Sequence, residues 1–148
     1  MKNTLAAAYN ENKRYETAYD LADLNNDEAG REAARIAHTE FENGLKARGT
    51  AYCIAYRLYA DMERRGNTLL DICEPIPASS LKDLLDTLRE NGIEAFTFSS
   101  TWSSAVETAW YFTELGCCLD GMTEINGACK NYLGDGFERV PAFFFRLD

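Results

Sequence analysis

The sequence predicts an α+β fold, in which an N-terminal helical hairpin packs with a small, mainly antiparallel three-stranded sheet and two further helices. Helical spacing of apolar residues dominates residues 1–66. Alternating apolar and polar residues with strand-forming side chains appear after residue 92, and Gly and Asn stops separate the segments. At 148 residues, the chain is expected to form one domain, with the hairpin in residues 1–66 and the α+β part in residues 67–148.

The hairpin is expected to consist of two helical segments. The first runs from Asn3 to Leu24, after which Asn25 is expected to cap the next segment in a capping box with Glu28. The second segment, Asp27–Arg65, allows two interpretations: one long helix, or two helices broken near Asn43-Gly44. We favour one long, bent helix because its apolar stripe keeps its phase across the glycines.

The middle of the chain is expected to contain a connection and one short helix. Leu69–Ile76 is apolar and short, and Pro75 and Pro77 restrict it to a connection or an edge strand. Ser79 and Ser80 are expected to cap a helix over Leu81–Arg89, which carries a stripe of leucines. Asn91-Gly92 is expected to end that helix.

The last third is expected to supply the sheet. Its three strands are predicted over Ile93–Ser99, Cys117–Ile125 and Val140–Leu147. A loop is predicted for Asn126–Glu138, because it contains three glycines.

A helix is expected between the first two strands. Ser104 with Glu107 matches a capping box, and Gly116 is expected to end the helix. We expect Val106, Trp110 and either Phe112 or Tyr111 to point inward from it.

Composition and charge narrow the classes of function. The net charge is −9, and Asn67 to Asp148 carries five Lys and Arg against thirteen Asp and Glu. Such an acidic half repels phosphate backbones, so we expect no direct nucleic-acid binding. A solvated acidic surface is the ordinary interpretation, and a basic partner protein is the functional one. No apolar run is long enough to span a membrane.

The cysteines and the single histidine argue against metal, cofactor and nucleophile chemistry. The five cysteines are an odd set without a CxxC pair, which disfavours a disulfide framework and a zinc site. The N-terminus lacks a signal-peptide pattern, so we expect a cytoplasmic protein. We also expect no cofactor. No local pattern pairs His38 with a cysteine, and we expect no catalytic residue and no enzyme.

The most suggestive polar cluster lies between the first predicted strand and the following helix. It comprises Ser99, Ser100, Thr101, Ser103 and Ser104. Backbone N–H groups at a helix N-terminus can hold an anion, but the glycines and lysine of a phosphate loop are missing. Simple capping is therefore the ordinary interpretation of these side chains.

Two further features of the last third suggest sites of binding. Trp102, in the same turn, is expected to be exposed, and an exposed tryptophan suggests a binding hot spot. Glu124 and Asp120 would share one face of a strand, a weak pattern for a cation.

Two segments in the last third of the chain resemble known sequences. The first is Phe96-Thr97-Phe98-Ser99-Ser100-Thr101-Trp102-Ser103-Ser104-Ala105-Val106-Glu107-Thr108-Ala109-Trp110, and the second is Gly121-Met122-Thr123-Glu124-Ile125-Asn126. With these segments, the chain resembles small proteins of conjugative or phage-like elements in gram-positive gut bacteria. The resemblance implies an accessory role on a mobile element and no known activity. It also draws attention to Glu124 and Asn126.

Three functional hypotheses follow. The first is a non-enzymatic accessory protein that binds an unidentified protein partner through the hairpin or the Trp102 turn, with a homodimer left open. The second is an acidic nucleic-acid mimic that inhibits a host defence protein. The third is an anion- or small-ligand-binding protein, or an enzyme, that uses the Ser99–Ser104 turn together with Glu124.

Overall fold

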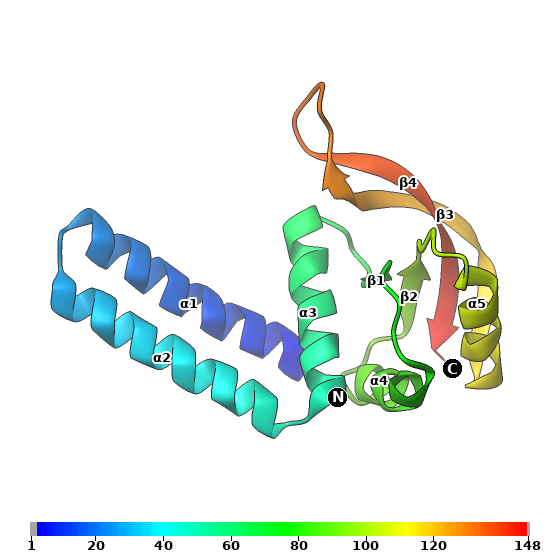
Figure 1. Ribbon diagram of the computed structural model, residues 1–148, viewed down its shortest axis with the longest axis horizontal. Helices are drawn as coiled ribbons and strands as arrows, with labels where there is room; N and C mark the ends of the chain where they lie inside the picture. The colour runs from blue at the N-terminus through cyan, green and yellow to red at the C-terminus, as the bar shows by residue number, and fades with distance from the viewer. Residues whose placement is uncertain (1–2, 148) are drawn as a thin grey trace.

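A computed structural model shows an α+β fold with five helices and one four-stranded sheet over residues 3–147, the described part of the chain (Figure 1). The α+β prediction is confirmed. The sheet has four strands in the order β1-β2-β4-β3 where three mainly antiparallel strands were predicted, and the added edge strand β1 runs parallel to β2. The other two pairings are antiparallel.

The N-terminal part contains three helices, where two were predicted. α1 (Thr4–Leu24) and α2 (Glu28–Ala47) form an antiparallel hairpin that extends away from the sheet (Figure 1). α3 (Thr50–Arg65) is separate, so the prediction of one long helix was wrong. The break lies at Gly49 rather than at Asn43-Gly44, because Gly49 adopts a positive φ of 101° that other residues avoid.

Two predicted helix starts were also misplaced. Asp27, not Asn25, caps α2, because its side chain accepts a hydrogen bond from the Gly30 N–H at 3.0 Å. α4 (Ala78–Glu90) starts directly after Pro77, so Ser79 and Ser80 lie inside its first turn and do not cap it. Proline before a helix start pre-sets the backbone without needing an N–H partner.

The sheet is built by two short strands and one long hairpin. β1 (Asp71–Ile72) is an edge strand, which was one of the two interpretations of that segment, and β2 is Ala95–Phe98. β3 (Cys117–Lys130) and β4 (Phe137–Leu147) extend well beyond their predicted bounds. The connection between the two strands is therefore residues 131–136, shorter than the predicted loop Asn126–Glu138, and the ribbon projects as an arm (Figure 1).

The core lies between the sheet and helices α3, α4 and α5 (Ala105–Glu114). α4 buries its leucine stripe there. The rings of Phe96, Phe112 and Phe145 are fully buried and lie 5.0 to 5.4 Å apart between centroids. Rings at these distances interact favourably beyond the area they bury. This cluster fixes α5 against strands β2 and β4.

Candidate functional site

The Ser99–Ser104 turn is mostly engaged in local contacts. The Ser99 hydroxyl donates to Asp71 at 2.6 Å, and Ser100 Oγ accepts from the Trp102 N–H at 3.2 Å. Thr101, Ser103 and Ser104 are exposed. Ser104 occupies the position before α5, but its side chain makes no capping hydrogen bond. The capping box that the sequence predicted is therefore absent.

Glu124 and Asn126 lie on β3, in a groove of about 270 Å³. Arg139 on β4 holds both, donating from Nε to Glu124 at 2.9 Å and from Nη1 to Asn126 at 2.9 Å. The groove is also lined by Thr97 but by no residue of the Ser99–Ser104 turn. The structure thus brings Glu124 and Asn126 together and does not add the turn to them.

Asn126 also joins the sheet to the end of α3. Its side-chain amide donates to the Arg65 carbonyl at 2.7 Å. Its backbone N–H and carbonyl exchange hydrogen bonds of 3.0 and 2.9 Å with the Asn67 side chain. Two reciprocal bonds of this kind satisfy backbone groups on an edge strand, which would otherwise pair with another chain. Asn126 therefore has a structural role here.

The predicted face shared by Asp120 and Glu124 does not form a cation site. The pairing of β3 with β4 shifts between Leu119 and Met122, which places Asp120 in a bulge. Asp120 pairs with Arg146 at 3.2 Å, whereas Glu124 pairs with Arg139. Within residues 3–147, no group of three or more His, Cys, Asp and Glu side chains is placed to hold a metal ion.

A buried polar cluster that the sequence did not indicate lies where α3 meets β1. The Arg65 side chain is 1% exposed and pairs with Asp71 at 3.0 Å and with Asp61. Asp71 in turn accepts hydrogen bonds from Thr97 at 2.8 Å and from Ser99. Buried charges require such pairing. The only indication of this cluster in the sequence is Asp71, an acidic residue inside a short apolar segment, and this pattern is weak evidence for a buried ion pair.

The ionisation states of the groups in this cluster indicate a structural role, because a charged Arg65 joins α3 to β1 through Asp71. Burial lowers the pKa of Arg65, but hydrogen bonds to Asp61, Asp71 and Cys73 outweigh burial and raise it. Burial raises the pKa of the Cys73 thiol, although Arg65 lies 3.3 Å from its sulfur. A raised pKa disfavours the reactive thiolate. A pocket of about 160 Å³ beside Cys73 therefore lacks an activated nucleophile.

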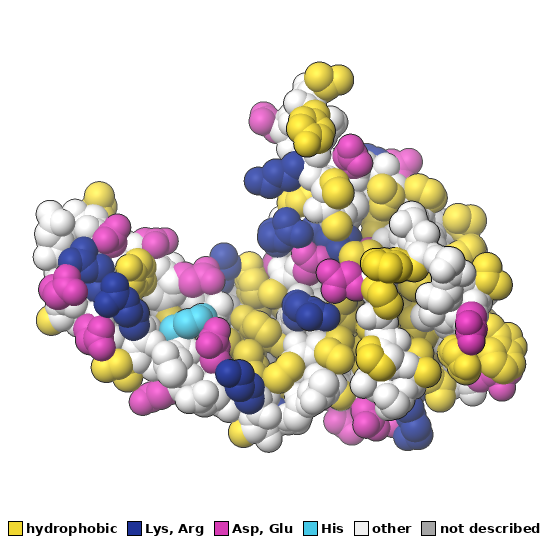
Figure 2. Space-filling model, in the orientation of Figure 1, with side chains coloured by type: hydrophobic (Ala, Val, Ile, Leu, Met, Phe, Trp, Pro, Cys, Tyr) yellow, Lys and Arg dark blue, Asp and Glu magenta, His cyan; other side chains and the backbone are white. Residues whose placement is uncertain are grey.

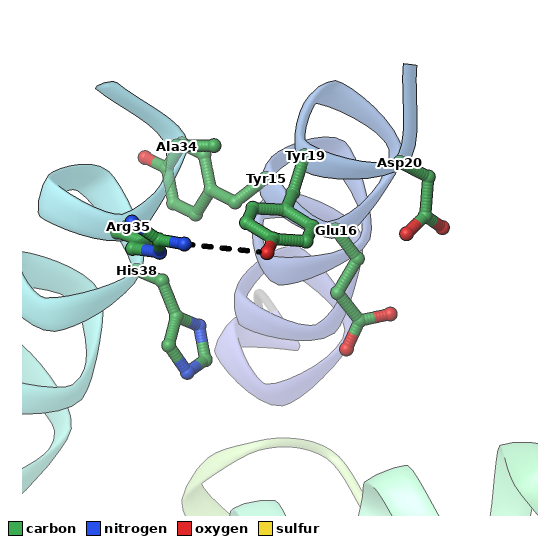
Figure 3. Close-up of a pocket in the computed structure, with 7 residues that line it drawn as sticks. All are labelled: Tyr15, Glu16, Tyr19, Asp20, Ala34, Arg35 and His38. Atoms are coloured by element: carbon green, nitrogen blue, oxygen red, sulfur yellow. Dashed lines mark hydrogen bonds between the residues drawn. The ribbon is translucent and has the colours of Figure 1, made fainter. Parts of the chain in front are cut away.

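The helical hairpin carries a shallow groove of about 550 Å³ (Figure 3). Tyr15, Glu16, Tyr19 and Asp20 line it from α1, and Ala34, Arg35 and His38 line it from α2. Its basic groups already have partners in the hairpin: Arg35 bonds Tyr19 and Glu32, and His38 lies 3.0 Å from Asn12 and 3.1 Å from Glu42. We assign no ligand to this groove.

The largest exposed apolar side chains next to the phenylalanine core lie on and beside α5. Trp102 is 58% exposed, as predicted, but Val106 and Trp110 are 84% and 55% exposed, so the prediction that they point inward was wrong. α5 instead turns Ala105, Ala109 and Phe112 toward the core. Small alanines allow the helix to approach the sheet closely, and this leaves the larger residues outside.

Strand β3 extends this apolar surface. Leu119 and Met122 are 46% and 63% exposed. They pair with Phe145 and Phe143 of β4. Because cross-strand partners share a face, and Phe145 contacts Phe112 of α5, both side chains lie on the α5 side of the sheet. We call Trp102, Val106, Trp110, Leu119 and Met122 the α5 face. Figure 2 shows hydrophobic side chains gathered over this side of the molecule.

Comparison with known proteins places this surface inside a family domain. Residues 54–147 match the family described as a domain of unknown function, DUF7698. The chain belongs to this family. No curated protein and no solved structure matches it. The family domain starts inside α3, so it contains the sheet, the Arg65 cluster and the whole α5 face, and it leaves out the α1–α2 hairpin.

The described helices also bear on the expectation of no membrane segment. None of the helices within residues 3–147 is long and apolar enough to cross a membrane.

Proposed function

We propose that this DUF7698 chain is a non-enzymatic accessory module that binds a partner protein through the α5 face. The observation that carries the proposal is the row Trp102, Val106 and Trp110, all more than half exposed. The chain has only two tryptophans, and both lie in this row. Tryptophan is the residue type most enriched at the energetic centres of protein interfaces. Contiguous exposed apolar residues are typical of interaction sites.

The support beneath the face fits a docking role. Val106 and Trp110 are one helical turn apart on α5, and Trp102 precedes them by one turn, with its carbonyl accepting from the Ala105 N–H at 3.0 Å. The opposite side of α5 is fixed by Phe112, which contacts Phe96, Phe98 and Phe145. A helix held in this way presents its side chains without a large ordering cost on binding.

The cellular setting is part of the same proposal. We propose a cytoplasmic accessory role on a mobile element. The resemblance of the Phe96–Trp110 stretch supports the mobile element, and the odd set of five cysteines supports a reducing compartment. The nucleic-acid mimic remains a separate hypothesis, and the pairing of Asp120 and Glu124 with arginines dilutes the negative surface that it needs.

Site-specific photo-crosslinking tests the docking role in the producing cell. Benzoylphenylalanine replaces Val106 in one variant and Leu24, which is 80% exposed at the hairpin tip, in a matched control. We expect Val106 to crosslink a defined protein that Leu24 does not. The purified partner should then bind the wild-type chain and lose at least tenfold affinity for W102A/W110A. Equal crosslinking at both positions, or unchanged affinity of the double variant, contradicts the proposal.

A further inference from the structure

We infer that the segment docking on the α5 face is a cationic amphipathic helix. This inference rests on the proposed function and specifies the chemistry of the partner. It follows from three properties of the face: its charge, the spacing of its carboxylates and the type of its aromatic rings.

The segment that carries the face has no basic residue of its own, and from the neighbouring α4 Arg89 donates to the Leu115 carbonyl at 3.0 Å. From Ser99 to Cys129 the sequence contains no Lys or Arg. Asp120 and Glu124 already pair with arginines of β4. Glu107 and Glu114 on α5 are exposed, and neither forms an ion pair with another residue in the range 3–147. The face therefore offers two carboxylates that lack a basic partner.

The two carboxylates have a defined spacing. Glu107 and Glu114 are seven residues apart on α5, which is about two turns and about 10.5 Å along the helix axis. They lie on one flank of the Val106–Trp110 row, on the side away from the buried Phe112. A partner helix beside α5 would meet both with Lys or Arg residues seven positions apart. Apolar residues at spacings of three and four would then cover the row.

The aromatic rings favour the same partner. Trp102 and Trp110 are 58% and 55% exposed, and the faces of tryptophan rings attract Lys and Arg as well as apolar groups. Neutral apolar segments would bury the rings but leave Glu107 and Glu114 without compensation, and acidic segments would be repelled. An anionic membrane, the other surface that exposed tryptophans can enter, carries the wrong charge for this flank.

The α5 face can select a partner of opposite charge, and this distinguishes it from the hairpin. The hairpin also has exposed apolar residues, namely Leu21, Leu24 and Ile36. Its charges of both signs are mixed, and many are already paired, as Figure 2 shows for the alternating basic and acidic side chains over it. Nothing there selects the charge of a partner.

Calorimetric titration with three synthetic helical peptides tests the inference. The first has Leu at helical spacing and Lys residues seven positions apart. The second has the same composition in scrambled order, and the third carries Glu in place of Lys. We expect binding of the first peptide alone, weakening as salt concentration rises. E107Q/E114Q removes two exposed ion pairs with the Lys residues of this peptide, so we expect its affinity to fall by about 3- to 10-fold.

Matched variants separate the contributions. D20N/E40Q removes the same net charge from the hairpin and should leave affinity unchanged, since both residues lie outside the face. W102A/W110A should lose at least tenfold affinity. Circular dichroism checks that every variant is folded.

Each other outcome has a definite meaning. Equal binding of the Lys and Glu peptides, lost in W102A/W110A, keeps the docking function and overturns the cationic partner. Equal binding of the ordered and scrambled Lys peptides, or equal losses in E107Q/E114Q and D20N/E40Q, reduces the effect to net charge and also overturns it. Binding to vesicles of phosphatidylcholine with phosphatidylserine, in preference to all peptides, overturns both proposals in favour of a membrane surface.

Discussion

The α1–α2 hairpin and the family domain are stabilised by different means. The family domain closes around large side chains, with Phe96, Phe112 and Phe145 fully buried. In the hairpin beyond its first turn, the buried side chains are the small Ala8, Ala22 and Ala34. Within the hairpin, the edge contact of Tyr15 with Phe41 and exposed ion pairs supply the rest, and Phe41 also contacts Tyr56 of α3. Exposed pairs contribute little to stability, so the hairpin depends on its anchor.

That anchor is small and specific. Leu5 of α1 is fully buried in the domain core. The Thr4 backbone and hydroxyl donate to the Asn91 side chain at the end of α4, at 2.8 and 2.6 Å. The contrast indicates that the domain folds around its own core and that the hairpin is an attached element. Four experiments test this contrast, from the largest expected effect to the smallest.

Phe96→Ala should cost about 4 kcal/mol of unfolding free energy, because it opens a cavity in the ring cluster. Phe41→Ala in the hairpin, where the ring is only partly buried, should cost about 1 kcal/mol. Urea unfolding followed by circular dichroism measures both. Equal costs would show that the hairpin is as tightly packed as the domain.

Asp71→Ala should cost about 3 kcal/mol, because it leaves the buried Arg65 with one carboxylate partner fewer. The exposed pair Lys82–Asp86 is the matched control, and Lys82→Ala should change stability by less than about 0.5 kcal/mol. The same urea experiment applies. A small loss for Asp71→Ala would mean that water or Asp61 compensates the guanidinium.

Acid should weaken the junction of α3 with the sheet through Asp61. Burial raises the pKa of this carboxyl, but hydrogen bonds from Arg64 and Arg65 outweigh burial and lower it below its ordinary value of 3.8. Its stabilisation is therefore present above pH 3.8 and is lost as the pH falls through the folded value below it. Asp61→Asn should be less stable than the wild type at neutral pH, and the two stabilities should converge in acid. A constant difference would exclude Asp61 as the titrating group.

Gly44→Ala should stabilise the hairpin by up to about 1 kcal/mol, since no atom lies within 4 Å of the added Cβ and alanine favours a helix. Gly30→Ala should give less or the opposite sign, because its Cβ would collide with the Asp27 carboxylate that caps α2 and would lie 3.0 Å from the Ala22 Cβ. Thermal melts of both variants measure the difference. Stabilisation of equal size would show that the Asp27 side chain and α1 give way without cost.

The features that the sequence predicted correctly, such as helix ends, depend on residues that are close together in the chain. Stops at Gly92 and Gly116 are confirmed by their positive φ angles, and the α+β class follows from the pattern of segments along the chain. For α5, the inward position of Phe112 is confirmed, but Val106 and Trp110 face outward because Ala105 and Ala109 pack against the core instead. The Arg65–Asp71 pair was missed because its burial depends on the distant Thr97 and Ser99, which the tertiary fold brings to Asp71. The exposure of Trp102 was predicted, but the extent of the face needed the fold.

Tryptophan emission tests the docking face most directly, because Trp102 and Trp110 are the chain's two tryptophans and both belong to it. The free protein should emit at long wavelength, as water-exposed indoles do. Saturation with the Leu/Lys helical peptide should shift the emission to shorter wavelength, with no shift for the scrambled peptide. Emission that stays unchanged while the peptide binds in calorimetry would place the bound helix elsewhere and contradict the account.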